Sequence, residues 1–120
     1  MRVLVVDDSA TVRRRLLAML GEFEAVEAFE AEDVRAARDV LESTAIDAVI
    51  LDLCLRECRA FELIGQIKST RPGATVVILT NDAGEAQRRE CLLRGADHFF
   101  DKSLQFERAL DVVIARADKA

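Results

Sequence analysis

The chain has 120 residues, a length that suits one folded domain, spanning residues 1–120, with a substantial core. Its formal net charge of -5 argues against broad binding to nucleic acid or anionic membranes, because both need a basic surface. The first apolar run is too short for a signal peptide or a membrane span, and an odd number of cysteines, three, favours reduced thiols. We therefore expect a cytoplasmic protein that neither inserts into a membrane nor binds nucleic acid directly.

The first half of the chain alternates between strand-like and helical patterns. Residues 2–6 (RVLVV) form a short apolar run typical of a strand buried on both faces. Residues 25–29 (AVEAF) alternate apolar and polar side chains, which suits an edge strand. Helical spacing follows each run, and the apolar positions of the two expected helices are Val12, Leu16, Met19 and Leu20, then Val34, Ala37 and Leu41.

The second half repeats this alternation three times, with strands expected at 48–51, 75–79 and 96–100. The third and fifth helices have clear apolar faces, made by Phe61, Ile64 and Ile67 and by Phe106, Leu110, Val113, Ile114 and Ala117. The fourth, within residues 83–95 (AGEAQRRECLLRG), has a narrow apolar set, a helix-breaking Gly84 and a stop at Gly95. We expect it to be the least defined helix and a mobile one.

Five alternating strands and helices predict an open, doubly wound α/β domain, in which helices cover both faces of a parallel sheet. In such sheets, ligands bind beyond the carboxyl ends of the strands. The residues expected there are Asp7 and Asp8 after the first strand, Asp52 after the third, Thr80, Asn81 and Asp82 after the fourth, and Asp101 and Lys102 after the fifth. We expect these side chains to converge in one crevice.

The expected crevice contains the parts of a phosphoryl-transfer site. Carboxylates ~4 Å apart repel by ~4 kcal/mol at an effective dielectric of ~20, so Asp7, Asp8 and Asp52 together need a counter-charge. Oxygen ligands select a hard cation such as Mg²⁺, with Mn²⁺ as a substitute. Lys102 and Thr80 add a positive charge and a hydroxyl donor for phosphoryl oxygens. The set predicts phosphoryl transfer with Asp52 as the nucleophile.

Four segments resemble the motifs of a known family. VLVVDDSATVRR, VILDLCL, VVILTND and GADHFFDKS, in this order and spacing, are similar to the receiver domain of bacterial two-component response regulators over essentially the whole chain. The resemblance implies the flavodoxin-like, three-layer (βα)5 fold of that family, with a five-stranded parallel sheet in the order 2-1-3-4-5. It also implies a phosphorylation-controlled switch that is not a turnover enzyme and catalyses only its own phosphoryl acceptance and autodephosphorylation.

The same resemblance assigns roles to the acidic residues. Asp52 would accept a phosphoryl group from a phosphohistidine on a sensor histidine kinase or a histidine phosphotransfer protein. Asp8, Asp52 and the backbone carbonyl of Cys54 would bind Mg²⁺ directly. Asp7 would act on the metal through water.

The resemblance also implies how the signal is read. Thr80 and Lys102 would hold the phosphoryl oxygens, and Phe99 would be the aromatic side chain that swings inward on activation. The readout would be a population shift of the face made by the fourth helix, fifth strand and fifth helix. This face would contact an unknown downstream effector protein and is also a candidate homodimer interface.

Four residues depart from the usual pattern of the family. Arg56 and Ala60 replace a proline and a glycine that usually follow the phosphoacceptor by four and eight residues. Ser103 stands where a cis proline usually follows the lysine. Because a non-proline cis bond costs ~2.5–4 kcal/mol, we predict a trans bond, or else a strained bond that is held by its surroundings. Asn81 replaces a small residue, which would narrow access for small phosphodonors and water.

Two other functions share parts of this pattern. A haloacid-dehalogenase-like phosphatase also uses an aspartate nucleophile with Mg²⁺, but that family needs a second aspartate two residues on, where this chain has Cys54. A flavodoxin-like cofactor-binding module shares the architecture, but no glycine-rich phosphate loop follows the first strand.

The cysteines and arginines allow further interpretations. Cys54, Cys58, Cys91 and His98 total four zinc ligands, but their spacing and their places on different elements argue against such a site. A redox pair of Cys54 and Cys58 is an alternative based on their proximity. Arg13 to Arg15, Arg88, Arg89 and Arg94 are expected on solvated helix faces, where docking of a kinase or an effector is an alternative role.

Overall fold

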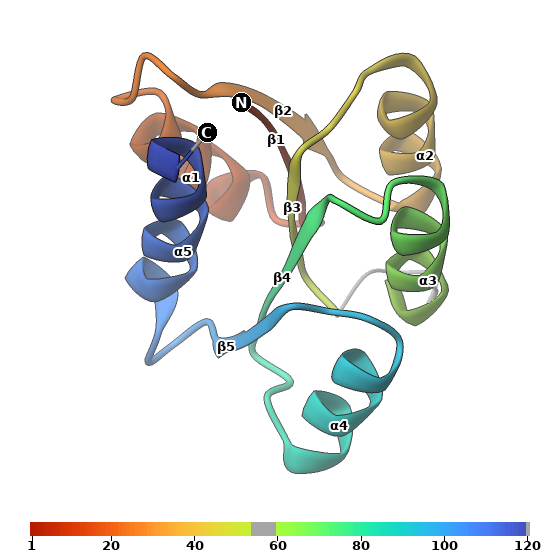
Figure 1. Ribbon diagram of the computed structural model, residues 1–120. Coiled ribbons are helices and arrows are strands. Elements are labelled where there is room, and N and C mark those ends of the chain that lie inside the picture. Colours follow the sequence, from red (N-terminus) through yellow and green to blue (C-terminus); the bar gives the residue numbers. More distant parts are fainter. Residues whose placement is uncertain (54–59, 120) are drawn as a thin grey trace.

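The computed structural model describes residues 1–53 and 60–119 as a parallel sheet between two layers of helices (Figure 1). The strands are β1 (Arg2–Val6), β2 (Glu27–Ala31), β3 (Ala48–Leu51), β4 (Thr75–Thr80) and β5 (His98–Asp101). The helices are α1 (Ala10–Leu20), α2 (Val34–Ser43), α3 (Ala60–Thr70), α4 (Glu85–Leu93) and α5 (Phe106–Lys119). The strand order β2-β1-β3-β4-β5 confirms the predicted doubly wound fold and places the weakly apolar β2 at an edge.

The core lies on both faces of the sheet because successive strand residues point in opposite directions. In β1, Leu4 and Val6 pack with residues of α2, α3 and α4, whereas Val3 and Val5 pack with residues of α1 and α5. Figure 1 shows the resulting layers, with α1 and α5 on one side of the sheet and α2 and α3 on the other. Within the described ranges, no helix is long and apolar enough to cross a membrane.

Two strand boundaries were predicted two residues too early. The second strand begins at Glu27, because the chain before it forms a turn in which the Val26 amide donates to the Phe23 carbonyl. The fifth strand begins at His98, because the Ala96 amide is used to close the preceding helix through the Cys91 carbonyl. In both places the local hydrogen bonds of a turn or helix end override an apolar pattern.

The fourth helix, α4, is present, and it ends just before Gly95 as the sequence predicts. Gly95 has a φ of 108°, and its amide donates to the Leu92 carbonyl while the Ala96 amide donates to the Cys91 carbonyl, a Schellman motif. The start of α4 lacks a side-chain cap because Gly84 occupies that position, and Cys91 is the only buried residue in the helix. These features agree with the weak apolar set, and the mobility of α4 stays a prediction.

Leu63 and Leu93 form a matched pair that tests the position of the core. Leu63 in α3 is 0% exposed, whereas Leu93 at the end of α4 is 76% exposed. Leu63→Ala should lower the free energy of unfolding by about 2–5 kcal/mol, because apolar burial is lost and a cavity remains. Leu93→Ala should change it by less than about 0.5 kcal/mol. Urea denaturation measures both values, and equal losses would contradict this core.

Candidate functional site

Three aspartates meet at the carboxyl ends of β1 and β3, as the topology predicts. Asp7, Asp8 and Asp52 each present a carboxylate oxygen, and these oxygens lie within 4.8 Å of one another. Asp7 and Asp52 are buried, whereas Asp8 is exposed. The cluster therefore combines two carboxylates removed from bulk water with a third that faces it.

Lys102 is the counter-charge of the two buried carboxylates. Its ammonium Nζ lies 2.7 Å from Asp7 Oδ2 and 3.0 Å from Asp52 Oδ2, and donates a hydrogen bond to each. The lysine follows β5, and β4 lies between that strand and β3, so its side chain spans the end of the sheet. Only 12% of the side chain is exposed. A largely enclosed cation is thus held between two acids that follow β1 and β3.

Burial and pairing act in opposite directions on the pKa values of Asp7 and Lys102. Burial raises the pKa of Asp7 above its usual value, and the hydrogen bonds from Lys102 and Ser9 offset this only in part. For Lys102, burial lowers the pKa, but hydrogen bonds and charge attraction from Asp7 and Asp52 outweigh it, so the pKa is raised overall. The lysine therefore stays cationic. The ionised form of Asp7 is less favourable here than in water, because its hydrogen bonds do not fully offset the cost of burial.

The turn after β1 fixes the orientation of Asp7. One carboxylate oxygen, Oδ1, accepts a hydrogen bond of 2.8 Å from the Ser9 amide, and the other is the one that binds Lys102. Ser9 in turn caps α1, because its side chain accepts from the Val12 amide. The start of α1 and the position of the carboxylate are consequently set by the same turn.

Arg13 supports the turn that carries Asp7, a role that the sequence interpretation missed. It was expected on a solvated face, but its side chain is only 11% exposed. The guanidinium donates through Nη1 to the Asp7 carbonyl at 2.7 Å and through Nε to Glu30 at 2.8 Å. Arg13 therefore ties the turn that carries Asp7 to the edge strand β2. Its neighbour Arg14 is exposed, as predicted, and only the period of α1 distinguishes the two.

Thr80 ends β4 beside the lysine. It is fully buried, and its hydroxyl oxygen accepts a hydrogen bond of 3.1 Å from the Asp82 amide. The Lys102 amide donates to the Thr80 carbonyl at 2.9 Å, which continues the pairing of β4 with β5 past the end of the sheet. The threonine and the lysine are thus joined through their backbones.

Ser103 and Asn81, two of the four residues that depart from the family pattern, contact each other at the carboxyl edge of the sheet. The Ser103 hydroxyl and Asn81 Oδ1 are 3.2 Å apart and form a hydrogen bond in which the serine donates. The turn is also closed by the Asp101 carboxylate, which accepts from the amides of Ser103 at 2.8 Å and Leu104 at 3.3 Å. No cis peptide bond occurs in the described residues, which agrees with the predicted trans bond before Ser103. Local hydrogen bonds hold this turn around Ser103.

The other residues singled out in the sequence either lie away from the aspartate cluster or fall outside the described residues. Phe99 is partly buried and packs against the core on the α2, α3 and α4 side. Ala60 begins α3 and is buried. Cys54, whose carbonyl was expected to bind the metal, Cys58, its expected redox partner, and Arg56 lie outside the described residues.

The remaining zinc candidates do not form a site in the described part of the chain. Cys91 is buried in α4, and burial raises the pKa of its thiol to about 11, which disfavours the thiolate that binds zinc. His98 stacks on Phe100, with ring centroids 6.0 Å apart. Among the residues described, the group able to hold a metal is the one made by Asp7, Asp8 and Asp52.

The doubly wound sheet with acids and a lysine at its carboxyl edge defines a class of α/β domains, and comparison with known proteins identifies the family. The family model described as the response regulator receiver domain matches residues 3–114. The response regulator MprA of Mycolicibacterium vanbaalenii is 33% identical over 109 residues, which cover 91% of this chain and 47% of that protein. The chain belongs to the receiver domain family of two-component response regulators.

Solved structures agree with this assignment. A CheY-like receiver domain protein from Methanospirillum hungatei superposes with a TM-score of 0.87 at 24% identity, covering 98% of this chain and 94% of that one. A Burkholderia pseudomallei response regulator, described with a phosphorylated aspartic acid, a calcium ion and citrate, gives 0.84 at 22% identity, covering 99% and 72%. These two matches show the fold. The chain spans about half the length of the response regulators it matches in sequence, and the phosphatase and flavodoxin-like alternatives are not favoured.

Arg13 and Arg14 provide a matched test of the clamp on the first turn. Arg13→Ala should lower the free energy of unfolding by about 1–3 kcal/mol, because the Asp7 carbonyl and Glu30 lose a charged donor. Arg14→Ala should change it by less than about 0.5 kcal/mol. Chemical denaturation measures both, and amide exchange should quicken at Ser9 only in Arg13→Ala. An equal effect of the two substitutions would contradict the clamp.

Proposed function

We propose that Asp52 accepts a phosphoryl group from a phosphohistidine of a sensor histidine kinase or a histidine phosphotransfer protein. The observation that carries the proposal is the Lys102 ammonium held within 3.0 Å of the Asp52 carboxylate in a buried, acidic site. In this step an oxygen of Asp52 attacks phosphorus while the bond from phosphorus to the donor imidazole nitrogen breaks. The nitrogen leaves with the electron pair and takes up a proton. The phosphoryl group is later released by attack of water.

The described side chains have the chemistry for these roles. Lys102 would move its hydrogen bond from the Asp52 carboxylate to a phosphoryl oxygen, and it stays cationic because its pKa is raised by its acidic neighbours despite burial. Thr80 is buried at the end of the adjacent strand and carries a hydroxyl that can donate to another phosphoryl oxygen. Transfer of this kind depends mostly on positioning and on charge neutralisation.

The acidic cluster fits a magnesium ion. Carboxylate oxygens from three residues lie within 4.8 Å of one another, and hard oxygen ligands of this kind suit Mg²⁺ or Mn²⁺. We propose Asp8 and Asp52 as direct ligands together with the Cys54 carbonyl. Both oxygens of Asp7 already accept hydrogen bonds, which supports an indirect role through water. When bound, the metal would supply positive charge to the transferring phosphoryl group.

The proposed readout is a shift in the packing of α4, β5 and α5. Phe99 lies in β5, is only partly buried, and packs against the core cluster that includes Cys91 of α4. Leu92 and Leu93 at the end of α4 are exposed, 39% and 76%, and they provide an apolar surface for an effector or for a second copy of the chain. Phosphorylation would favour one of two packings of this face.

Intact mass after incubation with acetyl phosphate and Mg²⁺ tests the phosphoacceptor. Wild type and the surface variant Asp39→Asn should gain one phosphoryl group that is stable in acid and labile in base. Asp52→Asn, and wild type with EDTA, should gain none, because the nucleophile or the metal is missing. If acetyl phosphate fails, a phosphohistidine donor protein replaces it, since Asn81 narrows access. No adduct from either donor would contradict the proposal.

Magnesium binding can be tested without phosphorylation. At a Mg²⁺ concentration a hundred times its Kd, wild type should gain about 2.7 kcal/mol of stability, because the ion binds only the folded chain. Asp8→Asn should gain clearly less at the same concentration, since it lacks one anionic ligand, whereas Asp39→Asn should match wild type. Thermal unfolding with and without Mg²⁺ measures the gain. An equal gain in Asp8→Asn would contradict the ligand assignment.

A further inference from the structure

A groove between α1 and α5 is separate from the aspartate cluster. It has a volume of about 340 Å³ and an apolar floor that includes Met19, Leu110 and Ile114. Phe23, in the turn after α1, forms part of its wall and is 42% exposed, which makes it the one exposed large aromatic side chain among the described residues. An aromatic side chain left half in solvent beside an apolar floor is typical of a surface that another molecule covers.

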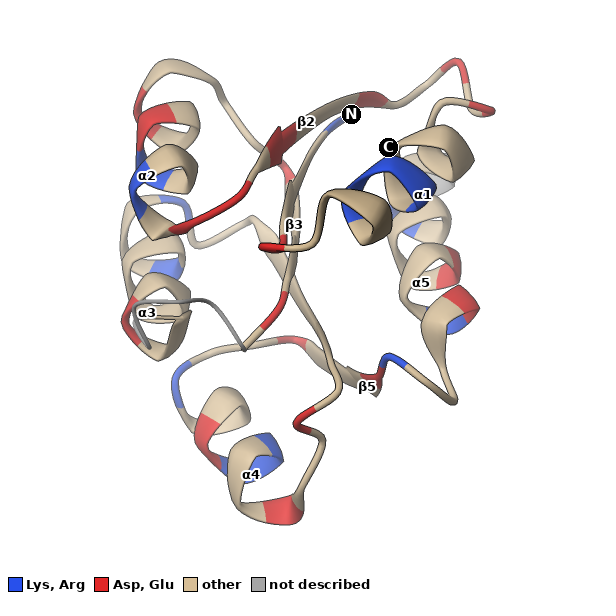
Figure 2. Cartoon of the chain, turned by 180° about the vertical axis from the view of Figure 1, so that it is seen from behind, with Lys and Arg blue, Asp and Glu red and all other residues tan. Residues whose placement is uncertain are grey.

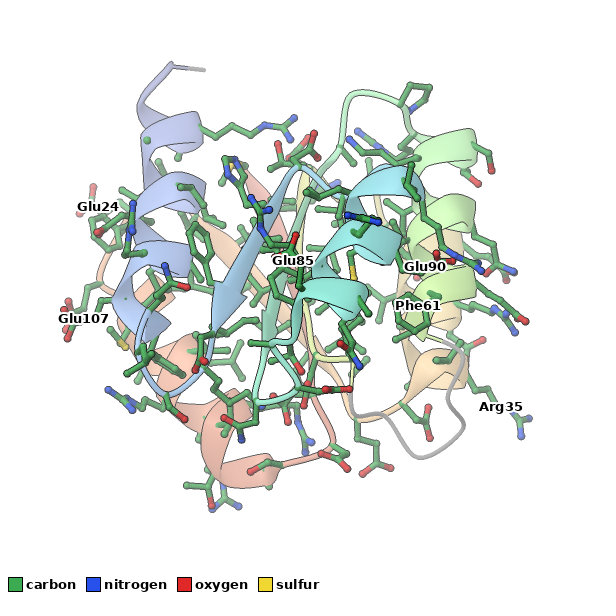
Figure 3. All side chains as sticks on the ribbon, turned by 90° about the horizontal axis from the view of Figure 1, so that it is seen from below. Glu24, Arg35, Phe61, Glu85, Glu90 and Glu107 are labelled. Carbon is green, nitrogen blue, oxygen red and sulfur yellow. The ribbon has the colours of Figure 1, made fainter. Side chains whose placement is uncertain are left out.

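All the charged residues that line this groove are acidic. They are Glu22, Glu107 and Asp111, and none of them has an ion-pair partner within the described part of the chain. Glu107 and Asp111 are four residues apart on α5, an unfavourable spacing for like charges on a helix. Glu107 and Glu24 both project outward on the α5 side of the molecule (Figure 3). Figure 2 shows acidic segments along the same helix.

A second groove, between α2 and α3, gives a useful contrast. It has a similar volume, about 300 Å³, but its arginines are already engaged by the chain itself. Arg38 donates to Gln66 at 2.9 Å, and Arg71 lies 3.6 Å from Asp47. The two arginines of the α2–α3 groove are therefore engaged by the chain itself, whereas the three acids of the α1–α5 groove have no ion-pair partner among the described residues.

We propose that the α1–α5 groove binds a basic amphipathic helix of a partner protein. Apolar side chains of that helix would cover the floor and Phe23, and its lysines or arginines would pair with Glu22, Glu107 and Asp111. A second copy of this chain is a poorer occupant, because a two-fold contact would bring the acidic rim against itself. An anionic membrane or a nucleic acid is repelled for the same reason. The binding does not depend on the phosphorylation of Asp52.

The test uses the full chain and two synthetic helical peptides as probes. One peptide has leucines at i, i+3, i+4 and i+7 with lysines elsewhere, and the matched peptide has glutamates in place of the lysines. Fluorescence anisotropy measures Kd, and amide shifts of the 15N-labelled chain locate the contact. The lysine peptide should bind saturably, with shifts gathered in the second half of α1, the turn with Phe23, and α5. The glutamate peptide should not bind.

Matched variants decide whether the groove is the binding surface. Asp111→Lys and Phe23→Ser should each weaken binding about tenfold, because a central charge or an apolar anchor is lost. Asp39→Lys and Leu104→Ser, which change an exposed acid and an exposed apolar residue elsewhere, should leave Kd within about twofold. Circular dichroism checks that each variant folds.

Three results would overturn the proposal. The first is no saturable binding of the lysine peptide. The second is an equal loss of binding in the groove and control variants. The third is a concentration-dependent dimer in sedimentation that Phe23→Ser abolishes, which would assign the groove to a second copy of the chain.

Discussion

The site depends on one electrostatic constraint, the burial of two carboxylates at the end of the sheet. Asp7 and Asp52 follow the neighbouring strands β1 and β3, so the parallel pairing of these strands brings their charges together. Removal from water makes each charge unfavourable unless a cation is near, and Lys102 supplies it. The turns that surround the site hold the three groups in place. In the proposed function, Lys102 would move its hydrogen bond from the Asp52 carboxylate to a phosphoryl oxygen.

The sheet architecture and most of the site follow from patterns that are local in sequence. The apolar runs predict the order of strands and helices, and the rule that ligands bind at carboxyl ends then selects the aspartates, Thr80 and Lys102. Local patterns do not show where the hydrogen bonds of a turn or a helix end replace those of a strand. The residues before β2 and β5 look strand-like but are used by a turn and by the end of α4.

Arg13 shows the other kind of information that a sequence lacks. Three arginines in a row suggest a solvated face, and nothing in their order says which one turns inward. The distinction comes from the rotation of α1 about its axis and from Glu30 on a strand that pairs with β1. Ser103 gives a second example. The sequence shows that a serine replaces the usual proline, but the contact of this serine with Asn81 depends on how the loops after β4 and β5 pack together.

The contact between Lys102 and Asp7 joins residues 95 positions apart in the chain. During synthesis, the first strand therefore leaves the ribosome with its acids long before their lysine exists. A nascent chain that has folded up to β4 would carry all three aspartates without the lysine that balances Asp7 and Asp52. The acidic edge is complete only when β5 has joined the sheet and brought Lys102 to Asp7 and Asp52.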